Sequence, residues 1–345
     1  MTATDNQAVA VLLTLLVGAG GAALFHVIGF PAALLTGPAT CVSLATLMGL
    51  RVVIPPALRD TVFVVLGVQI GSTVTPEVVD AALTWPVSLA VLAMTLIVVL
   101  AILPAVLMRL FAMDRLTALL AAAPGHLSYV LGLSADLAAD VPRVALVQSV
   151  RVLLLTLLVP VLISLWGVEG TAFLAEQETG SLLALAVIFA VALATGLLFK
   201  RWNMPAALLL GAMTVSAIAH GGALTTGTAP TWLTTAAFVC MGSLIGTRFS
   251  GVTFLQLRSA VVAGVFTTVF ACAIAALGAW FAAALVGLSP AALLLAFAPG
   301  GVEVMAALAV KTGLEPALVA AHHVFRLVIL SVLLPVFLMR YRQRH

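Results

Sequence analysis

The chain has 345 residues, of which 63% are hydrophobic and only 8% are charged, with a formal net charge of +3 and a mean hydropathy of +1.27. A soluble globular domain carries about 25% charged residues, so this composition excludes that class and predicts a polytopic membrane protein. The small positive charge comes from arginines between apolar segments and forms no basic surface for nucleic acid.

Twelve apolar segments follow one another along the chain, six in each half. In the first half they are expected near 8–27, 31–50, 58–75, 84–110, 116–134 and 142–166. In the second half they are expected near 181–199, 204–219, 232–248, 259–286, 290–311 and 316–340. We expect residues 1–170 and 181–345 to form two membrane repeats, with 171–180 as a short extracytoplasmic linker.

The two halves repeat one another. Pro124-Gly125 recurs as Pro299-Gly300, and Arg151 recurs as Arg326, each at an offset of 175 positions. An internal duplication in so apolar a chain is typical of membrane transporters.

The fifth segment of each half is interrupted by a proline and a glycine, which disfavour a continuous helix. If this segment enters the bilayer and returns on the same side, every basic loop is cytoplasmic, as the positive-inside rule requires. The sequence then predicts an all-α polytopic fold of two inverted repeats, each with five crossing helices and one re-entrant or broken helix. Both termini are expected in the cytoplasm. A broken fifth segment that crosses, with another segment failing to span, is the alternative.

An arginine lies deep in the sixth segment of each half. Arg151 and Arg326 are each about ten positions from the segment start, near mid-bilayer at about 1.5 Å rise per residue. Arginine at that depth faces a partner or a water-filled cavity. One interpretation is that each neutralises a carboxylate or caps hairpin carbonyls. The other is an anion-binding pair, since the planar guanidinium suits carboxylate and phosphate.

Substrate-binding residues are expected where the two fifth segments break. A break at membrane depth leaves backbone N–H groups at the start of the following helix, and these suit an anion. The Pro-Gly pair also has a simpler interpretation as a turn. The candidate substrate-binding residues are Arg151, Arg326, Pro124, Gly125, His126, Ser128, Pro299, Gly300 and Gly301.

Three titratable residues are candidates for proton coupling. Glu303, at the place of Ser128 in the duplication, is the only carboxylate deep in an apolar segment. We interpret it either as a proton carrier or as the static partner of Arg326. His322 and His323 lie four and three residues before Arg326, and histidine titrates near physiological pH.

Glycines four residues apart mark the third segment of each half, at Gly67 and Gly71 and at Gly242 and Gly246. We assign them to close helix packing. The three cysteines lie inside apolar runs without metal-ligand spacing, so no metal and no cofactor are expected.

The chain resembles the AbrB membrane protein family, which also bears an ammonia monooxygenase label, over nearly its whole length. The resemblance rests on the Pro-Ala-Ala-Leu-Leu runs at 31–35 and 205–209, on Ala-Pro-Gly-Gly at 298–301 and on Ala-Ala-His-His-Val-Phe-Arg at 320–326. It implies a fold similar to the cation–proton antiporter and bile-acid transporter type. The family labels imply gene regulation or an oxygenase, but the chain has neither a DNA-reading surface nor a histidine cluster for copper or iron.

Together these features predict a secondary transporter or exporter of a small anionic solute that works by alternating access, and not an enzyme. The alternative is an indirect role in regulating gene expression without binding DNA. Expected partners are the lipid bilayer and a small solute or ion, with no nucleic acid. The sequence leaves open whether the protein forms a homo-oligomer. The expected location is the inner or plasma membrane.

Overall fold

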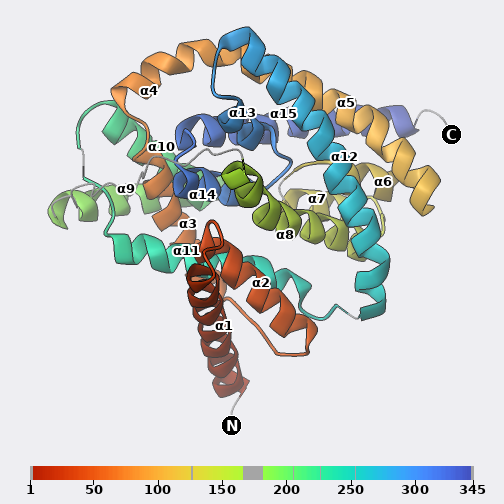
Figure 1. The fold of residues 1–345 in the computed structure, drawn as a ribbon, viewed down its shortest axis with the longest axis horizontal. Coiled ribbons are helices and arrows are strands. Elements are labelled where there is room, and N and C mark those ends of the chain that lie inside the picture. Colours follow the sequence, from red (N-terminus) through yellow and green to blue (C-terminus); the bar gives the residue numbers. More distant parts are fainter. Residues whose placement is uncertain are drawn as a thin grey trace. The chain divides into compact units, whose positions relative to one another are not determined.

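The computed structural model describes residues 3–125, 127–165, 182–204, 206–225, 227–252 and 254–342. The regular secondary structure of those residues is entirely helical, with no β-strand, which confirms the predicted all-α membrane protein (Figure 1). Six helices of the described chain are long and apolar enough to cross a membrane. They span Gln7–Val27, Pro76–Phe111, Val141–Leu165, Leu183–Arg201, Gln256–Val286 and Pro316–Met339. The number of crossings and the inversion of the repeats stay predictions.

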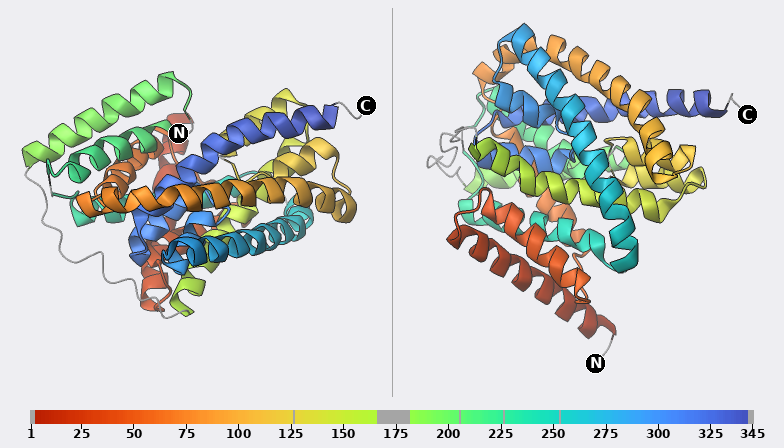
Figure 2. Two further views of the ribbon diagram at one scale, coloured as in Figure 1. Left: turned by 90° about the horizontal axis from the view of Figure 1, so that it is seen from above. Right: turned by 45° about the vertical axis from the view of Figure 1, so that its right-hand side comes forward.

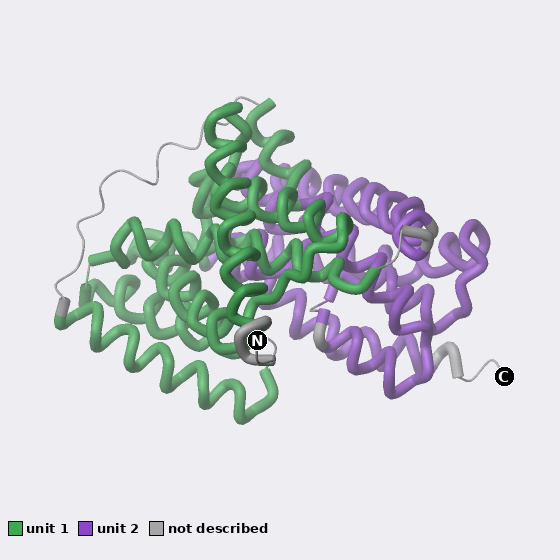
Figure 3. The backbone as a smooth tube through the Cα atoms, turned by 90° about the horizontal axis from the view of Figure 1, so that it is seen from below, with its two compact units in different colours: residues 1–82, 156–253, 306–317 green, residues 83–155, 254–305, 318–345 purple. Residues whose placement is uncertain are grey.

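The chain forms two compact units, which Figure 3 colours separately. The first contains residues 1–82, 156–253 and 306–317, and the second contains 83–155, 254–305 and 318–345. Each unit therefore takes helices from both predicted repeats. The predicted linker at 171–180 lies outside the described residues.

The main helices of the first unit come three from each half. These are α1 (Ala3–Val27), α2 (Ala33–Leu47), α3 (Pro56–Gly71), α9 (Leu182–Arg201), α10 (Ala207–Gly221) and α11 (Thr231–Gly246). The packing repeats with the sequence, because α1 packs on α2 as α9 packs on α10, and α2 packs on α11 as α10 packs on α3. Even a strained backbone recurs: Ala32 and Ala206, which precede α2 and α10, have φ of 52° and 49°.

The predicted packing role of the paired glycines is confirmed. A Cβ on Gly67 of α3 would lie 2.5 Å from the carbonyl oxygen of Leu209, and one on Gly71 would lie 2.5 Å from that of Met213, both on α10. Gly242 and Gly246 of α11 meet the backbone of α2 in the same way. Only glycine lets helix backbones approach this closely.

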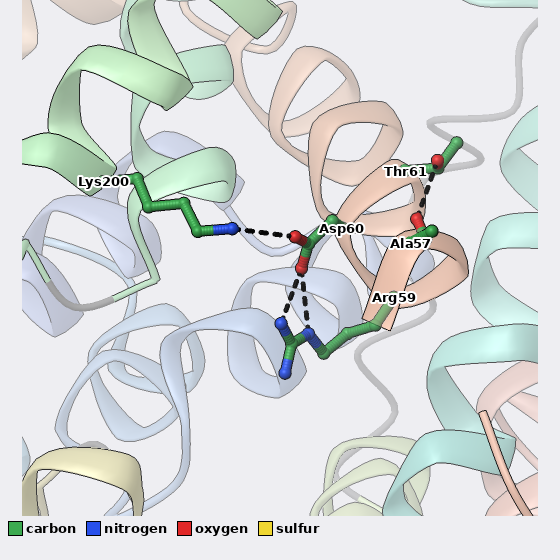
Figure 4. A network of polar contacts seen from close by, with 5 residues as sticks. All are labelled: Ala57, Arg59, Asp60, Thr61 and Lys200. Carbon is green, nitrogen blue, oxygen red and sulfur yellow. Dashed lines mark hydrogen bonds and ion pairs between the residues drawn. The ribbon is translucent and has the colours of Figure 1, made fainter. Parts of the chain in front are cut away.

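An ion-pair network joins α3 to the end of α9 (Figure 4). Asp60 accepts from Arg59 Nη2 at 2.7 Å and from Lys200 Nζ at 3.2 Å. All three side chains are partly exposed, so the network contributes little to stability.

In the second unit, two long helices, α5 (Trp85–Phe111) and α12 (Phe254–Val286), run side by side (Figure 2). Each packs on a short helix of its own half, α6 (Arg115–Ala122) for α5 and α13 (Pro290–Phe297) for α12. A buried apolar cluster that includes Leu103, Ala121 and Ala271 joins α5, α6 and α12. This pairing again follows the duplication.

Both fifth segments are broken where the sequence predicts. After α6 the chain resumes as α7 (Leu127–Asp136), and after α13 it resumes as α14 (Val302–Thr312). The sixth segments are α8 (Val141–Leu165) and α15 (Pro316–Arg342). Three short helices were not predicted: α4 (Pro76–Ala81) with 3-10 helix η1 (Ala82–Thr84), and 3-10 helix η2 (Thr247–Phe249).

Candidate functional site

Two buried side chains of α8 hold the end of the first short helix, α6. Gln148 Nε2 donates to the carbonyl oxygens of Leu120 and Ala123, each at 2.9 Å. Arg151 Nη1 donates to the Ala123 oxygen at 3.3 Å, and Arg151 Nη2 donates to Gln148 Oε1. The last carbonyls of a helix have no partner within the helix, so these donors satisfy groups that lie far from water.

Arg326 of α15 holds the end of the second short helix, α13, in the same way. Its Nη1 donates to the carbonyl oxygen of Ala298 at 2.6 Å, and its Nη2 donates to that of Gly300. The neighbouring His323 ring has its Nδ1 3.0 Å from the Val319 carbonyl oxygen, and its Nε2 has no hydrogen-bond partner among the described residues. Ala298 follows α13 with an extended backbone, as Ala123 follows α6.

Equivalent arginines of the two halves therefore make equivalent hydrogen bonds. Arg151 and Arg326 each donate to the carbonyl that ends the short helix 28 residues earlier. Gln148 and His323 occupy equivalent places in the duplication, but only Gln148 donates to the carbonyl that ends the short helix, because His323 Nε2 has no hydrogen-bond partner in the described part of the chain. The capping interpretation of the arginines is thus correct for part of each guanidinium.

The two arginines lie in one compact unit and in the same electrostatic environment. Both side chains are almost fully buried, and the charges of Arg151 and Glu303 act on Arg326. Arg326 Nε has no hydrogen-bond partner although its side chain is only 1% exposed. A buried N–H donor without an acceptor is rare in proteins and marks a place where a ligand oxygen gains a bond.

Glu303 lies in the first turn of α14, and its carboxylate folds back over Gly301. A Cβ on Gly301 would lie 3.1 Å from the carboxyl carbon and from both of its oxygens. The start of a helix favours negative charge, and the carboxyl group of Glu303 lies at that place, beside the second break. The two roles expected for Glu303, proton carrier and static partner of Arg326, both stay predictions.

The remaining predicted residues are placed as follows. Pro124, Pro299 and Gly300 are buried, and a Cβ on Gly300 would lie 2.6 Å from Met305 Cε, so the Met305 side chain would have to move for any larger residue there. Gly125 is half-buried and lies near Val130 and Leu330. His126 lies outside the described residues, and Ser128 lies in α7 with its side chain outside the description.

His322 has surroundings that differ from those of His323. Its Nδ1 lies 2.9 Å from the Leu318 carbonyl oxygen, and its Nε2 lies 2.8 Å from Ser88 Oγ on α5. Its ring centroid lies 6.2 Å from that of Trp85 and 6.0 Å from that of Phe297. Sequence reasoning missed Ser88, because it is a lone small polar residue in an apolar segment.

Comparison with known proteins agrees with the resemblance in the sequence. Residues 34–342 match the family model described as "Transition state regulatory protein AbrB". A Bacillus subtilis (strain 168) protein named YhjN is 30% identical over 298 residues, which are 81% of this chain and 77% of that protein. The protein named "Putative regulator AbrB" of Escherichia coli (strain K12) is 28% identical over 326 residues, 92% of this chain and 90% of that protein. This chain therefore belongs to the AbrB family.

Proposed function

We propose that this membrane protein is a secondary transporter or exporter that moves a small anionic solute by alternating access, with the solute bound beside Arg326 and Arg151. The observation that carries the proposal is the buried Nε–H of Arg326, which has no hydrogen-bond partner beside two broken helices. Broken helices in equivalent places of two repeats are typical of transporter binding sites.

The hydrogen bonds of Arg326 leave part of its guanidinium for a ligand. A guanidinium carries five N–H donors, and Arg326 spends one bond from Nη1 and one from Nη2 on carbonyls. These bonds fix the plane of the group, so its Nε–H points in one direction. An oxyanion that accepts this bond recovers about 1–3 kcal/mol of the cost of an unmade buried hydrogen bond.

Charge supports an anion over a cation or a neutral solute. Arg151 and Arg326 repel one another in apolar surroundings, and a negative ligand near both reduces that repulsion. Glu303 occupies the start of α14 as a negative group of the protein itself. The chemistry that fits the remaining donors is a carboxylate or a phosphate, because both accept planar N–H pairs.

The test is a thermal-shift screen of purified protein against small carboxylates and inorganic phosphate, followed by counterflow in proteoliposomes with the anion that shifts the melting temperature most. Arg326→Lys keeps the charge but has no Nε–H fork, so we expect at least a tenfold loss of affinity, or about 1.4 kcal/mol. Arg143→Lys is the matched control, because Arg143 Nη2 also donates to a backbone carbonyl, that of Phe111, at 2.6 Å. A flat screen, or equal counterflow by the two variants, would refute the proposal.

A regulatory role is the second candidate, and the observation that favours it is the name of the family and of the Escherichia coli relative. We propose that such a role would act indirectly, through the level of the transported solute. Expression changes in a deletion strain should then return to normal with the wild type but not with Arg326→Lys. Full restoration by this variant would instead separate regulation from transport.

A further inference from the structure

His322 has a hydrogen-bond arrangement that accepts a proton without losing a bond. Its Nδ1 faces the carbonyl oxygen of Leu318, which is only an acceptor, so Nδ1 carries a hydrogen. Its Nε2 faces the hydroxyl of Ser88, which can donate or accept. The ring is fully buried, so each of these contacts counts.

Ser88 has one hydrogen and two acceptors within reach. Its Oγ lies 2.8 Å from His322 Nε2 and 2.8 Å from the carbonyl oxygen of Trp85. With neutral His322 the hydroxyl donates to Nε2. When a proton binds to Nε2, the new N–H donates to Oγ and the hydroxyl turns to the Trp85 carbonyl. Both ring nitrogens of His322 are hydrogen-bonded in the neutral and in the protonated state, and the two states differ only by the proton on Nε2.

The neighbourhood of the ring bears on the cost of a positive charge there. Dry surroundings oppose a positive charge, but two acceptors and two aromatic rings about 6 Å away offset part of that cost. The charged residue of α5, Arg109, lies 21 residues from Ser88, or roughly 30 Å along the helix. α13 has no titratable residue, and α12 has the exposed Arg258 and the thiol of Cys272, on which the charge of Arg151 acts. The titratable groups near His322 are therefore His323 and Arg326 of its own helix.

His323 is a weaker proton site than His322. Its Nδ1 lies 3.0 Å from the Val319 carbonyl oxygen, its Nε2 has no hydrogen-bond partner within the ranges that the structure describes, and the charge of Arg326 acts on the ring directly. A second positive charge there is repelled.

We propose that His322, with Ser88 as its hydroxyl partner, binds the proton that this transporter couples to its anionic solute. The proposal rests on the proposed function. His322 lies one helical turn before Arg326, so an anion bound at Arg326 favours a proton at His322, and the proton in turn favours the anion. This reciprocity predicts symport, with the anion and the proton moving in the same direction.

The proton site can be tested without knowing the solute. In protein with 15N-labelled histidine, the Nε2 chemical shift reports protonation of each ring over about pH 5 to 8. We expect His322 to titrate in the wild type, and Ser88→Ala to lower its proton affinity at least fivefold. Ser88→Thr keeps the hydroxyl and should restore the wild-type affinity. The matched control is His220→Gln, a buried histidine of α10 that contacts carbonyls of Ser216 and Gly227; it should not change the His322 titration. A His322 that stays neutral throughout, or an unchanged affinity in Ser88→Ala, would overturn the proposal.

Adding a probe anion separates this proposal from the proposed function. Saturating acetate or inorganic phosphate should raise the proton affinity of His322 about fivefold or more, as expected for coupled sites. In Arg326→Lys the effect should disappear while the titration itself persists. A His322 that titrates but ignores both anions would support the proton site and count against the anion site.

Discussion

Arg326 donates from Nη1 to the carbonyl oxygen of Ala298 at 2.6 Å, which fixes this arginine of α15 on the open end of the short helix α13. Its second terminal nitrogen donates to Gly300, so one guanidinium holds both sides of the break. The same side chain lies in the field of Glu303. Arg326 is thus at once a structural cap and the candidate ligand-binding group, and variants can separate the two roles.

Removing the positive charge of Arg326 should destabilise the protein more than replacing its planar guanidinium by the ammonium group of lysine. Arg326→Lys still reaches a carbonyl, so we expect a loss of about 1–3 kcal/mol in the free energy of unfolding. Arg326→Met leaves the buried Glu303 without its positive neighbour, and we expect about 3–5 kcal/mol. Chemical unfolding in detergent measures both. Adding Glu303→Gln to Arg326→Met should recover part of the loss; if it adds further destabilisation, the two residues are not coupled.

The equivalent places of Gln148 and His323 predict that glutamine can replace the histidine. Gln148 Nε2 donates to the Ala123 carbonyl, whereas His323 donates from Nδ1 to the Val319 carbonyl and its Nε2 has no partner among the residues described. We expect His323→Gln to change stability by less than about 1 kcal/mol, since the glutamine amide supplies an N–H donor of its own. His323→Leu removes the donor and should cost about 1–3 kcal/mol.

Melting temperatures in one detergent suffice for the comparison of His323 variants. Similar melting temperatures for the glutamine and leucine variants would show that an N–H donor at position 323 contributes nothing. The reciprocal variant Gln148→Leu should behave like His323→Leu, because it removes donors from Leu120 and Ala123.

The glycine contacts in the first unit predict which glycine tolerates a methyl group. Gly67→Ala places a Cβ 2.5 Å from the Leu209 carbonyl oxygen, so α3 and α10 must move apart. We expect a loss of more than about 2 kcal/mol, in the range of an overpacked core. Gly20→Ala is the control, because a Cβ there meets nothing within 4 Å and alanine gains about 0.5–1 kcal/mol in a helix. Equal melting temperatures for the two variants would refute the contact.

The sequence predicted those parts of the site that the duplication marks. The two breaks and the buried Arg151 and Arg326 are visible from residues that recur at one offset. Ser88 was not predictable, because its importance comes from a 2.8 Å contact with a residue 234 positions later. It was also not predictable that each compact unit contains helices of both repeats. Apolar segments show how many helices a chain has but not which of them pack together.

The orientation of the broken fifth segment can be decided by labelling with a membrane-impermeant maleimide. In a variant without native cysteines, Arg109→Cys reports the side on which the segment begins and Asp136→Cys the side on which α7 ends; both side chains are exposed. A re-entrant segment places both on the cytoplasmic side, so only permeabilised cells should be labelled. Glu77→Cys is the extracytoplasmic control and should be labelled in intact cells. Labelling of Asp136→Cys but not Arg109→Cys in intact cells would mean that the broken segment crosses, and the two repeats would then not be inverted in the way that the loop charges predict.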